Sequence, residues 1–260
     1  MILNQGISII GCGNVAWHLA EAFRNSGTKI NCIVSRNPDK AKELATHIGT
    51  IYSNKLDSIP QNTSLALICI SDDAIEEVAK GINPEIPVAH TSASIPLSAL
   101  GSDNKSTGVF YPFQTFTKNV RQGSANFPVF IESESPEMLA VLEKLGNKVS
   151  DTVVKMTSEK RKYLHIAGII VNNFTNYLYG RANDILIEKG INPEYLLPII
   201  HETTAKLEFD HPDKLQTGPA RRKNYNVIQS HLELLKGEVE AEELYKFLST
   251  LILNHFNENK

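Results

Sequence analysis

The chain is poor in cysteine and has no long apolar run. Its three cysteines, Cys12, Cys32 and Cys69, are far apart, and each lies in or beside an expected strand. This pattern favours small buried side chains over disulfides or metal ligands. No apolar run reaches the roughly 18 residues of a membrane helix, so no membrane partner is expected. The first apolar run also begins too early for a signal peptide, which favours a cytoplasmic protein.

The chain also lacks an excess of positive charge. It has 26 Lys and Arg against 29 Asp and Glu, a formal net charge of −3, and no long basic block. Nucleic acid is therefore not expected as the main partner. The HExxH, Walker and GxSxG motifs are missing as well. The sequence thus carries no signature of a metal site, a Walker phosphate loop or a serine nucleophile.

A glycine turn lies between an apolar run and a helical pattern close to the N-terminus. The turn follows residues 7–10 and comprises Gly11, Cys12, Gly13, Asn14, Val15 and Ala16. Gly11 permits a tight turn, Gly13 lets the backbone approach a pyrophosphate, and the small Ala16 lets helix and strand pack closely. The free N–H groups at the helix start favour a phosphate anion. The stretch predicts a dinucleotide site; the alternative is a turn that only joins two packed elements.

The end of the second expected strand indicates which dinucleotide binds. An NAD site usually has Asp or Glu here to hold the ribose 2′-hydroxyl. This chain has Ser35 followed by Arg36. A guanidinium suits the 2′-phosphate of NADP in charge and geometry, whereas a carboxylate would repel it. We therefore predict NADP(H) as the cofactor; the alternative for Arg36 is an ordinary surface side chain before a helix.

Strand and helix patterns alternate through the first half and then give way to helices alone. Residues 1–153 predict an NADP-binding α/β Rossmann domain with a doubly wound, mostly parallel sheet. Residues 154–260 predict an all-α domain that begins with one long helix over 158–189. The expected strands cover residues 7–10, 29–34, 50–52, 65–70, 87–90, 107–111, 127–131 and 147–150.

Several segments together resemble one protein family. They are residues 11–16, 90–94, 108–116, 165–174 and 217–222, with His231. Through them the chain resembles the superfamily of 6-phosphogluconate dehydrogenase, pyrroline-5-carboxylate reductase and F420-dependent NADP oxidoreductase, and within it the Rossmann-like proteins with a DUF2520 domain. The resemblance covers nearly the whole chain and implies an NADP oxidoreductase without naming its reaction.

The chain departs from that family's pattern at two places. Tyr111-Pro112 stands where the family tends to have His-Pro, and Arg222-Lys223-Asn224 stands where it tends to have Arg-Gly-Asp. If that His or Asp were essential elsewhere, this chain would need another group for the same task.

Two loops lie where ligands bind in an open α/β sheet, at the carboxyl ends of strands. Ile70, Ser71 and Asp72 are expected along the nicotinamide ribose, although Asp72 could be a plain helix cap. The next loop is predicted to bind the cofactor near its nicotinamide and the substrate. Its polar residues are His90, Thr91, Ser92 and Ser94. His90 is also a catalytic candidate, and the alternative is a hydrogen-bonded structural histidine.

The long helical pattern carries a polar stripe. At 100° per residue, four polar side chains fall within about 20° of one line. They are His165, Asn172, Asn176 and Asn183. Buried polar groups need partners, which could be substrate, water or another subunit. A hydride reduction also needs a proton, and imidazole is a suitable donor, so we assign His165 as the donor. The alternative is a stripe that builds a dimer contact.

Further residues complete the predicted site. The resemblance implies Asn173 as a hydrogen bonder that orients the substrate. Tyr111 could donate the proton if a nearby cation depressed its pKa. Gln114, Thr115 and Arg222 are predicted to bind substrate, with a solvated turn as the alternative for Arg222.

These inferences together predict an NADP(H)-dependent oxidoreductase acting on a small, polar, anionic carbonyl or imine compound. The helical domain is expected to form a homodimer. A non-catalytic NADPH-binding sensor is the alternative, because the chain shows no clean Lys-x-x-x-Asn pattern in its long helix. A prephenate-dehydrogenase-like function is a third possibility, weakened by Tyr111 in place of the expected histidine.

Overall fold

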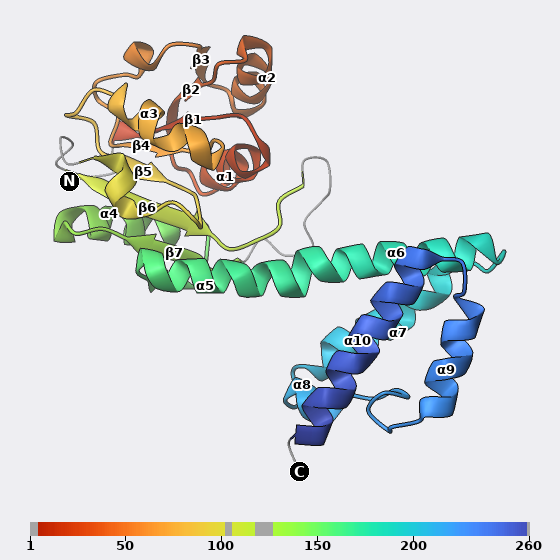
Figure 1. The fold of residues 1–260 in the computed structure, drawn as a ribbon. Helices are drawn as coiled ribbons and strands as arrows, with labels where there is room; N and C mark the ends of the chain where they lie inside the picture. The colour runs from red at the N-terminus through yellow and green to blue at the C-terminus, as the bar shows by residue number, and fades with distance from the viewer. Residues whose placement is uncertain (1–4, 102–105, 118–126, 259–260) are drawn as a thin grey trace. The chain divides into compact units, whose positions relative to one another are not determined.

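The computed structural model describes residues 5–101, 106–117 and 127–258. The chain forms two compact units, Met1–Asn172 and Asn173–Lys260 (Figure 1). The predicted domain boundary at 153/154 lies within the first of these units. Among the described residues, none of the helices combines the length and apolarity that a bilayer crossing requires.

An eight-stranded sheet forms the centre of the first unit, in the order β3-β2-β1-β4-β5-β6-β7-β8. All neighbouring strands are parallel except β6 and β7, which are antiparallel. This confirms the predicted doubly wound, mostly parallel sheet. The strands are β1 (Ile7–Ile10), β2 (Ile30–Val34), β3 (Ile51–Ser53), β4 (Leu65–Ile68), β5 (Val88–His90), β6 (Thr107–Pro112), β7 (Val129–Glu132) and β8 (Val153–Lys155).

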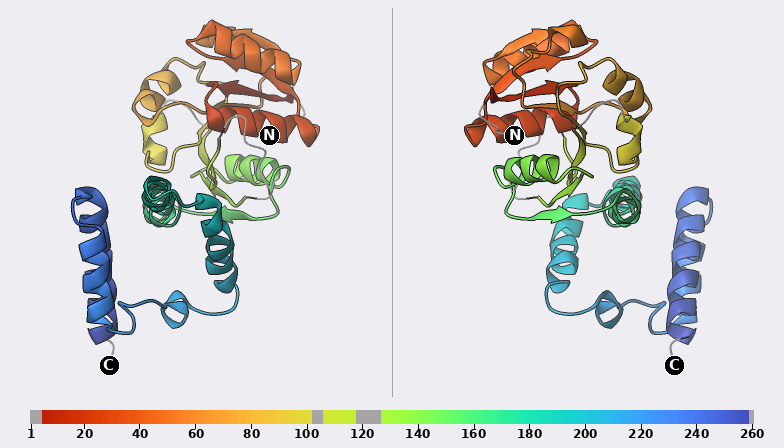
Figure 2. Two further views of the ribbon diagram at one scale, coloured as in Figure 1. Left: turned by 90° about the vertical axis from the view of Figure 1, so that its right-hand side faces the viewer. Right: turned by 90° about the vertical axis from the view of Figure 1, so that its left-hand side faces the viewer.

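Helices cover both faces of this sheet, which explains the continuous apolar runs of its central strands. Alternate strand residues point to opposite faces. Ile9 packs with Leu19 and Leu44 on one face, whereas Ile10 packs with Ile75 on the other. Figure 2 shows α1 and α4 on one side and α3 on the other. The helices are α1 (Asn14–Asn25), α2 (Pro38–Ile48), α3 (Ile75–Lys80), α4 (Pro136–Gly146) and α5 (Ser158–Gly168), with short 3-10 turns η2 (Leu56–Ser58), η3 (Asp72–Ala74) and η4 (Leu97–Leu100).

The last strand of the sheet is not where the sequence pattern predicts it. The prediction of a strand over residues 147–150 is wrong, because these residues close the turn after α4. The N–H groups of Val149 and Ser150 both donate to the carbonyl of Gly146 at 2.9 Å. The Ser150 hydroxyl donates to the carbonyl of Phe127 at 2.6 Å. After α4 the chain returns to the sheet only at β8, so the region made of helices alone begins at Ser158.

The long predicted helix over 158–189 is interrupted by a π-helix. It consists of α5, the π-helix η5 (Ile169–Phe174) and α6 (Thr175–Glu188). A π-helix bonds each residue five positions away instead of four, so it does not follow the 100° step of an α-helix. The polar stripe predicted at that step is therefore not continuous through this segment.

The second unit is made of helices, and very few of its described side chains are buried. Among its described residues only Ala220 and Ser249 are buried. Large apolar side chains such as Phe209 and Leu234 are 82% and 76% exposed. After α6 come η6 (Pro193–Leu196), α7 (Leu197–Lys206), α8 (Pro212–Leu215), α9 (Tyr225–Leu234) and α10 (Val239–Glu258).

Candidate functional site

A pocket of about 740 Å³ opens at the carboxyl ends of β1, β2 and β4. We call it the nucleotide pocket. Its lining includes ten of the residues predicted to bind the cofactor. They are Gly11, Cys12, Gly13, Asn14, Val15, Ser35, Arg36, Ile70, Ser71 and Thr91. Ala16 is fully buried beneath the turn, as expected of the residue that lets α1 pack on the sheet.

The two glycines of the turn have different reasons to be glycine. Gly11 has φ +115°, and a Cβ placed there would lie 2.1 Å from the carbonyl oxygen of Cys69. Gly11 is therefore required by the packing of the chain itself. A Cβ on Gly13 would meet nothing within 4 Å, so the absent side chain leaves open space beside the start of α1.

The start of α1 suits a phosphate anion. Its N-cap residue is Gly13, no side chain caps it, and its first turn contains no acidic residue. N–H groups at a helix start attract anions through their partial positive charge. The residues present therefore fit the pyrophosphate of a dinucleotide.

Ser35 and Arg36 follow β2 at the edge of the same pocket. The hydroxyl of Ser35 lies 3.0 Å from the thiol of Cys12 and accepts the N–H of Asn37 at 3.3 Å. Arg36 is exposed and lines the pocket, which places a guanidinium where a ribose phosphate is expected. Asn54, just after β3, also lines the pocket and was missed by sequence reasoning, since an isolated Asn carries no local signal.

The Ile70–Asp72 loop contributes unequally to the pocket. Ile70 and Ser71 line it, whereas Asp72 is exposed, is not among its lining residues and begins the turn η3. Ser71 is the N-cap of that turn but makes no side-chain cap bond. No side-chain hydrogen bond therefore supports the alternative that this loop only caps a helix.

The loop after β5 is held by its own side chains. His90 is fully buried, and its Nδ1 accepts the N–H of Ser92 at 3.2 Å. The Ser92 hydroxyl accepts the N–H groups of Ser94 and Ile95, each at 3.1 Å. His90 and Ser92 therefore shape the loop, whereas Thr91 reaches the nucleotide pocket and the Ser94 side chain is exposed.

The pKa of His90 lies far below its ordinary value. Burial is the main cause and lowers it to about 4, and the charge of Arg161 acts in the same direction. The Pro96 carbonyl and Glu132 act the other way but are weaker. His90 is thus a neutral imidazole at neutral pH, which favours the structural alternative for this residue.

Tyr111 and His165 come together although they are far apart in the sequence. The Tyr111 hydroxyl lies 3.3 Å from Nδ1 of His165, and the two rings meet edge to face. Burial raises the pKa of Tyr111 to about 12, and the charge of Arg161 offsets only part of this rise. The pKa of Tyr111 is thus raised, not depressed by the nearby cation, and the phenol keeps its proton.

Phe113 and Phe130 form an apolar wall beside this pair. Each makes an aromatic contact with Tyr111 and with the other. A Cβ on Gly168 would lie 2.8 Å from the Phe113 ring, so the glycine lets α5 pack closely against it. Beyond Phe113, Gln114 and Thr115 are exposed, and the Gln114 side chain accepts the Thr115 N–H at 2.8 Å.

Asn173 and Arg222, predicted to contact substrate, both belong to the second unit. Asn173 lies in the π-helix η5 and is exposed. Arg222 is an exposed residue whose N–H donates to the Gly218 carbonyl at 3.2 Å. The neighbouring guanidinium of Arg221 stacks on the Phe256 ring at 4.1 Å.

The turn after Arg222 shows what one departure from the family pattern does to the local structure. Lys223 has φ +56°, a left-handed conformation that glycine adopts without strain. Asn224 is the N-cap of α9, and its side chain accepts the N–H of Val227 at 3.3 Å. Asn and Asp are equally good N-caps. Lys-Asn thus performs the same local task here as Gly-Asp, with strain at Lys223.

Comparison with known proteins agrees with this fold and pocket. A family model described as "NADP oxidoreductase coenzyme F420-dependent" matches residues 6–91, and "Domain of unknown function (DUF2520)" matches residues 127–252. A candidate NADP oxidoreductase from Bacteroides fragilis is 33% identical, with a TM-score of 0.89 over 98% of this chain and 100% of that one. The comparison with curated protein sequences finds no match.

More distant solved structures share the fold. A reductive aminase from Aspergillus terreus, in complex with NADPH and ethyl-5-oxohexanoate, has 15% identity and a TM-score of 0.65 over 97% of this chain and 94% of its own. A 1-pyrroline-5-carboxylate reductase from Streptococcus pyogenes has 14% identity and a TM-score of 0.64 over 96% and 98%.

The fold and the nucleotide pocket define a Rossmann-type, NADP(H)-dependent oxidoreductase. Within this class, the chain belongs to the NADP oxidoreductase family in which an F420-dependent-type domain precedes a DUF2520 region.

Proposed function

We propose that this oxidoreductase transfers hydride between NADP(H) and a small, polar, anionic carbonyl or imine compound. The observation that carries the proposal is the contact of Tyr111 with His165 at the carboxyl edge of the sheet. His90 of β5 pairs with Val109 of β6, so Tyr111 lies at the same end of the sheet as Thr91, which lines the nucleotide pocket. The similar reductive aminase and pyrroline carboxylate reductase support the choice of substrate class.

In this proposal the Tyr111 hydroxyl sets which nitrogen of His165 carries a proton. The phenol keeps its proton, because its pKa is raised to about 12, and we assign it as the donor to Nδ1 of His165, 3.3 Å away. A neutral imidazole whose Nδ1 accepts must carry its proton on Nε2. Bound NADPH supplies the hydride. As Nε2 of His165 releases its proton to the substrate oxygen or nitrogen, Nδ1 takes the proton of the Tyr111 hydroxyl, so the imidazole stays neutral. Solvent then returns a proton to Tyr111, and the hydride and the transferred proton together balance the reduction.

The remaining predicted residues have roles on the substrate in this proposal. Arg222 would bind an anionic group, and Asn173 would orient the reacting group by a hydrogen bond. Ser94, Gln114 and Thr115 offer exposed polar groups on loops of the first unit. Among the residues predicted to bind substrate, Arg222 carries the positive charge that would pair with an anionic substrate.

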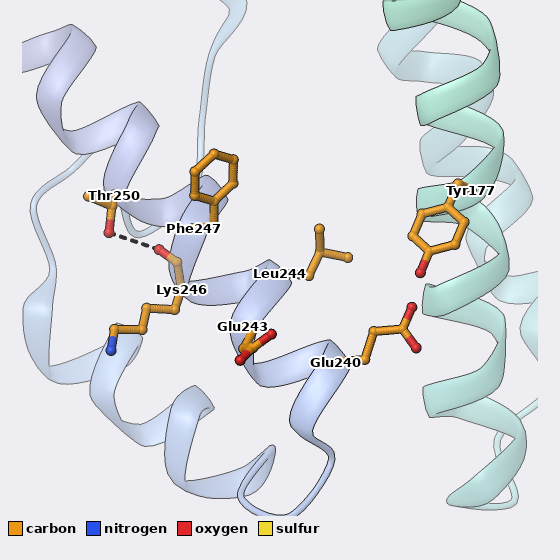
Figure 3. Close-up of a pocket in the computed structure, with 7 residues that line it drawn as sticks. All are labelled: Tyr177, Glu240, Glu243, Leu244, Lys246, Phe247 and Thr250. Carbon is orange, nitrogen blue, oxygen red and sulfur yellow. Dashed lines mark hydrogen bonds between the residues drawn. The ribbon is translucent and has the colours of Figure 1, made fainter.

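We also propose that a second copy of the chain covers the helical unit, which makes the protein a homodimer. A groove of about 610 Å³ lies beside α6 and α10 (Figure 3). Its lining residues are Tyr177, Glu240, Glu243, Leu244, Lys246, Phe247 and Thr250. Large apolar side chains of this unit, such as Phe209, Leu234 and Phe247, are exposed as well, and exposed apolar surface favours an interaction site. Sedimentation of the full chain tests this: a monomer at micromolar concentration would contradict it. A cytoplasmic location stays a prediction.

Nucleotide titration, followed by protein fluorescence, is the first test of the function. We expect NADPH to bind more tightly than NADH, and Arg36→Ala to weaken NADPH about 10- to 100-fold, as expected for the loss of a charged hydrogen bond. Lys40→Ala, an exposed cation on α2 outside the pocket, is the matched control. If neither nucleotide binds, the proposal fails.

Turnover is then measured as NADPH oxidation with oxo acids, with ketone and amine mixtures, and with cyclic imine carboxylates. Reduction of one class would support the proposal. NADPH binding that changes the oligomeric state, without turnover on any of these compounds, would favour the NADPH sensor instead.

A further inference from the structure

Arg161 is a charged side chain at the centre of the first unit. It belongs to the first turn of α5 and is 0% exposed. Charged side chains are almost never fully buried unless they are paired. Sequence reasoning missed Arg161 because it lies among the exposed charges Glu159, Lys160 and Lys162, which form an ordinary solvated helix start.

The Arg161 guanidinium connects three separate elements. Its Nη1 donates to the carboxylate of Glu132 on β7. Its Nε donates to the carbonyl of Ala93 at 3.2 Å, and its Nη2 donates to the carbonyl of Ile95 at 2.6 Å. Nη2 also donates to the Ser158 hydroxyl at 3.1 Å. One planar group thereby joins the loop after β5, the strand β7 and the helix α5.

Ser158 and Glu132 complete this arrangement. The Ser158 N–H and hydroxyl donate to the two oxygens of Glu132 at 2.8 and 2.7 Å. The Leu97 N–H donates to the Ser158 hydroxyl at 3.1 Å. We call Arg161, Glu132 and Ser158 the clamp.

The clamp fixes the same loop that His90 and Ser92 shape from within. His90 and Ser92 accept the N–H groups of Ser92, Ser94 and Ile95, while Arg161 satisfies the carbonyls of Ala93 and Ile95. In the loop that presents Thr91 to the nucleotide pocket, side chains of the loop thus bind its N–H groups and Arg161 binds its carbonyls.

The clamp also reaches the proton-donating pair. His165 lies four residues after Arg161, one turn along α5 and on the same face. The charge of Arg161 lowers the pKa of both His90 and Tyr111. Arg161 thus joins the loop at the nucleotide pocket to the helix that carries His165.

We propose that Arg161 is a positioning residue that holds the His90–Leu97 loop and the His165–Tyr111 pair in one fixed arrangement. This proposal rests on the proposed function, because it explains how His165 is held in position as the proton donor. The forked guanidinium is essential to the role: an ammonium can pair with Glu132 but cannot also reach both loop carbonyls in their fixed directions.

Three variants of the full chain, studied with NADPH bound, test the proposal. Arg161→Lys keeps the charge and loses the fork, Arg161→Met loses both, and Glu132→Gln removes the opposite charge. Lys162→Met removes an exposed cation next to Arg161 and is the matched control. If Arg161→Met does not fold, Arg161→Lys and Glu132→Gln carry the test.

The first measurement is amide hydrogen exchange at Ser94, Ile95 and Leu97, whose N–H groups are bonded within the loop and to the clamp. We expect exchange there to rise about tenfold or more in Arg161→Lys, while exchange in α1 and the affinity for NADPH stay within about threefold of wild type. Lys162→Met should match wild type. Unchanged exchange in Arg161→Lys, or an equal rise throughout the first unit, would overturn the proposal.

The second measurement is imidazole nitrogen NMR of His165. Wild type should show one tautomer with the proton on Nε2, and Arg161→Lys should show a mixture, because the Tyr111 contact is no longer held. An unchanged tautomer in every clamp variant would overturn the proposal. Neither measurement needs turnover. If both measurements give the expected results but wild type reduces none of the tested compounds, the proposed function fails and the positioning role of Arg161 stands.

Discussion

The hydroxyl of Tyr111 lies 3.3 Å from Nδ1 of His165, across 54 residues of sequence. If the phenol donates to Nδ1, as we propose, the neutral imidazole carries its proton on Nε2. In the proposed function His165 is the proton donor and Tyr111 is the residue that orients it, and this division of roles can be tested.

His165→Ala should lower kcat about 10²- to 10⁴-fold, which is the usual contribution of a positioned proton donor. Tyr111→Phe should cost less, because water can replace the phenol as the proton source for Nδ1, although the tautomer of the imidazole is then no longer fixed. NADPH affinity should stay unchanged in both variants. Steady-state kinetics and nucleotide titration check this, and turnover that survives His165→Ala would exclude the histidine as donor.

The two glycines of the turn should respond differently to the same substitution. Gly11→Ala should prevent stable folding, because its Cβ would overlap the Cys69 carbonyl at 2.1 Å. Gly13→Ala should fold, because a Cβ there meets nothing within 4 Å, but should bind NADPH more weakly since it fills space beside the phosphate. Thermal unfolding and titration separate the two effects. Normal NADPH affinity in Gly13→Ala would place the pyrophosphate elsewhere.

Acid should destabilise the first unit through His90. Its pKa is about 4 in the folded chain and 6.5 when unfolded, so the unfolded chain binds a proton first as the pH falls. The stabilising effect is complete above pH 6.5 and is lost as the pH falls towards 4. The loss should be up to about 3 kcal/mol. Urea unfolding of wild type and His90→Asn between pH 7.5 and 4.5 isolates it, because the difference between them should shrink on acidification. A constant difference would contradict the prediction.

Replacing Lys223 by glycine should stabilise the protein. The left-handed φ of +56° strains a lysine but not a glycine. Relief of this strain, reduced by the greater freedom of glycine in the unfolded chain, should raise the free energy of unfolding by about 0.5–1 kcal/mol. Arg222→Gly is the matched control and should destabilise. Denaturant midpoints check the pair, and a lower midpoint for Lys223→Gly would show that the lysine side chain contributes contacts of its own.

The parts of this protein that the sequence predicted well are those set by local pattern. The glycine turn and the apolar strands each depend on neighbours within a few residues, whereas the role of Arg36 after β2 stays a prediction. The residues that it missed depend on distant partners: Arg161 bonds to Ala93 and Ile95, which lie 68 and 66 positions earlier. The stripe through Asn172 failed for another reason, because a fixed 100° step cannot anticipate a π-helix.

The helical unit, in which only Ala220 and Ser249 are buried among the described residues, has a consequence for how the protein is made. The sheet of the first unit has its own core of buried side chains. The helices that follow have little to fold around until something covers them. If a second copy of the chain covers them, as we propose, completion of the fold is a bimolecular event, governed by the concentration of newly made copies as much as by the sequence of any one of them.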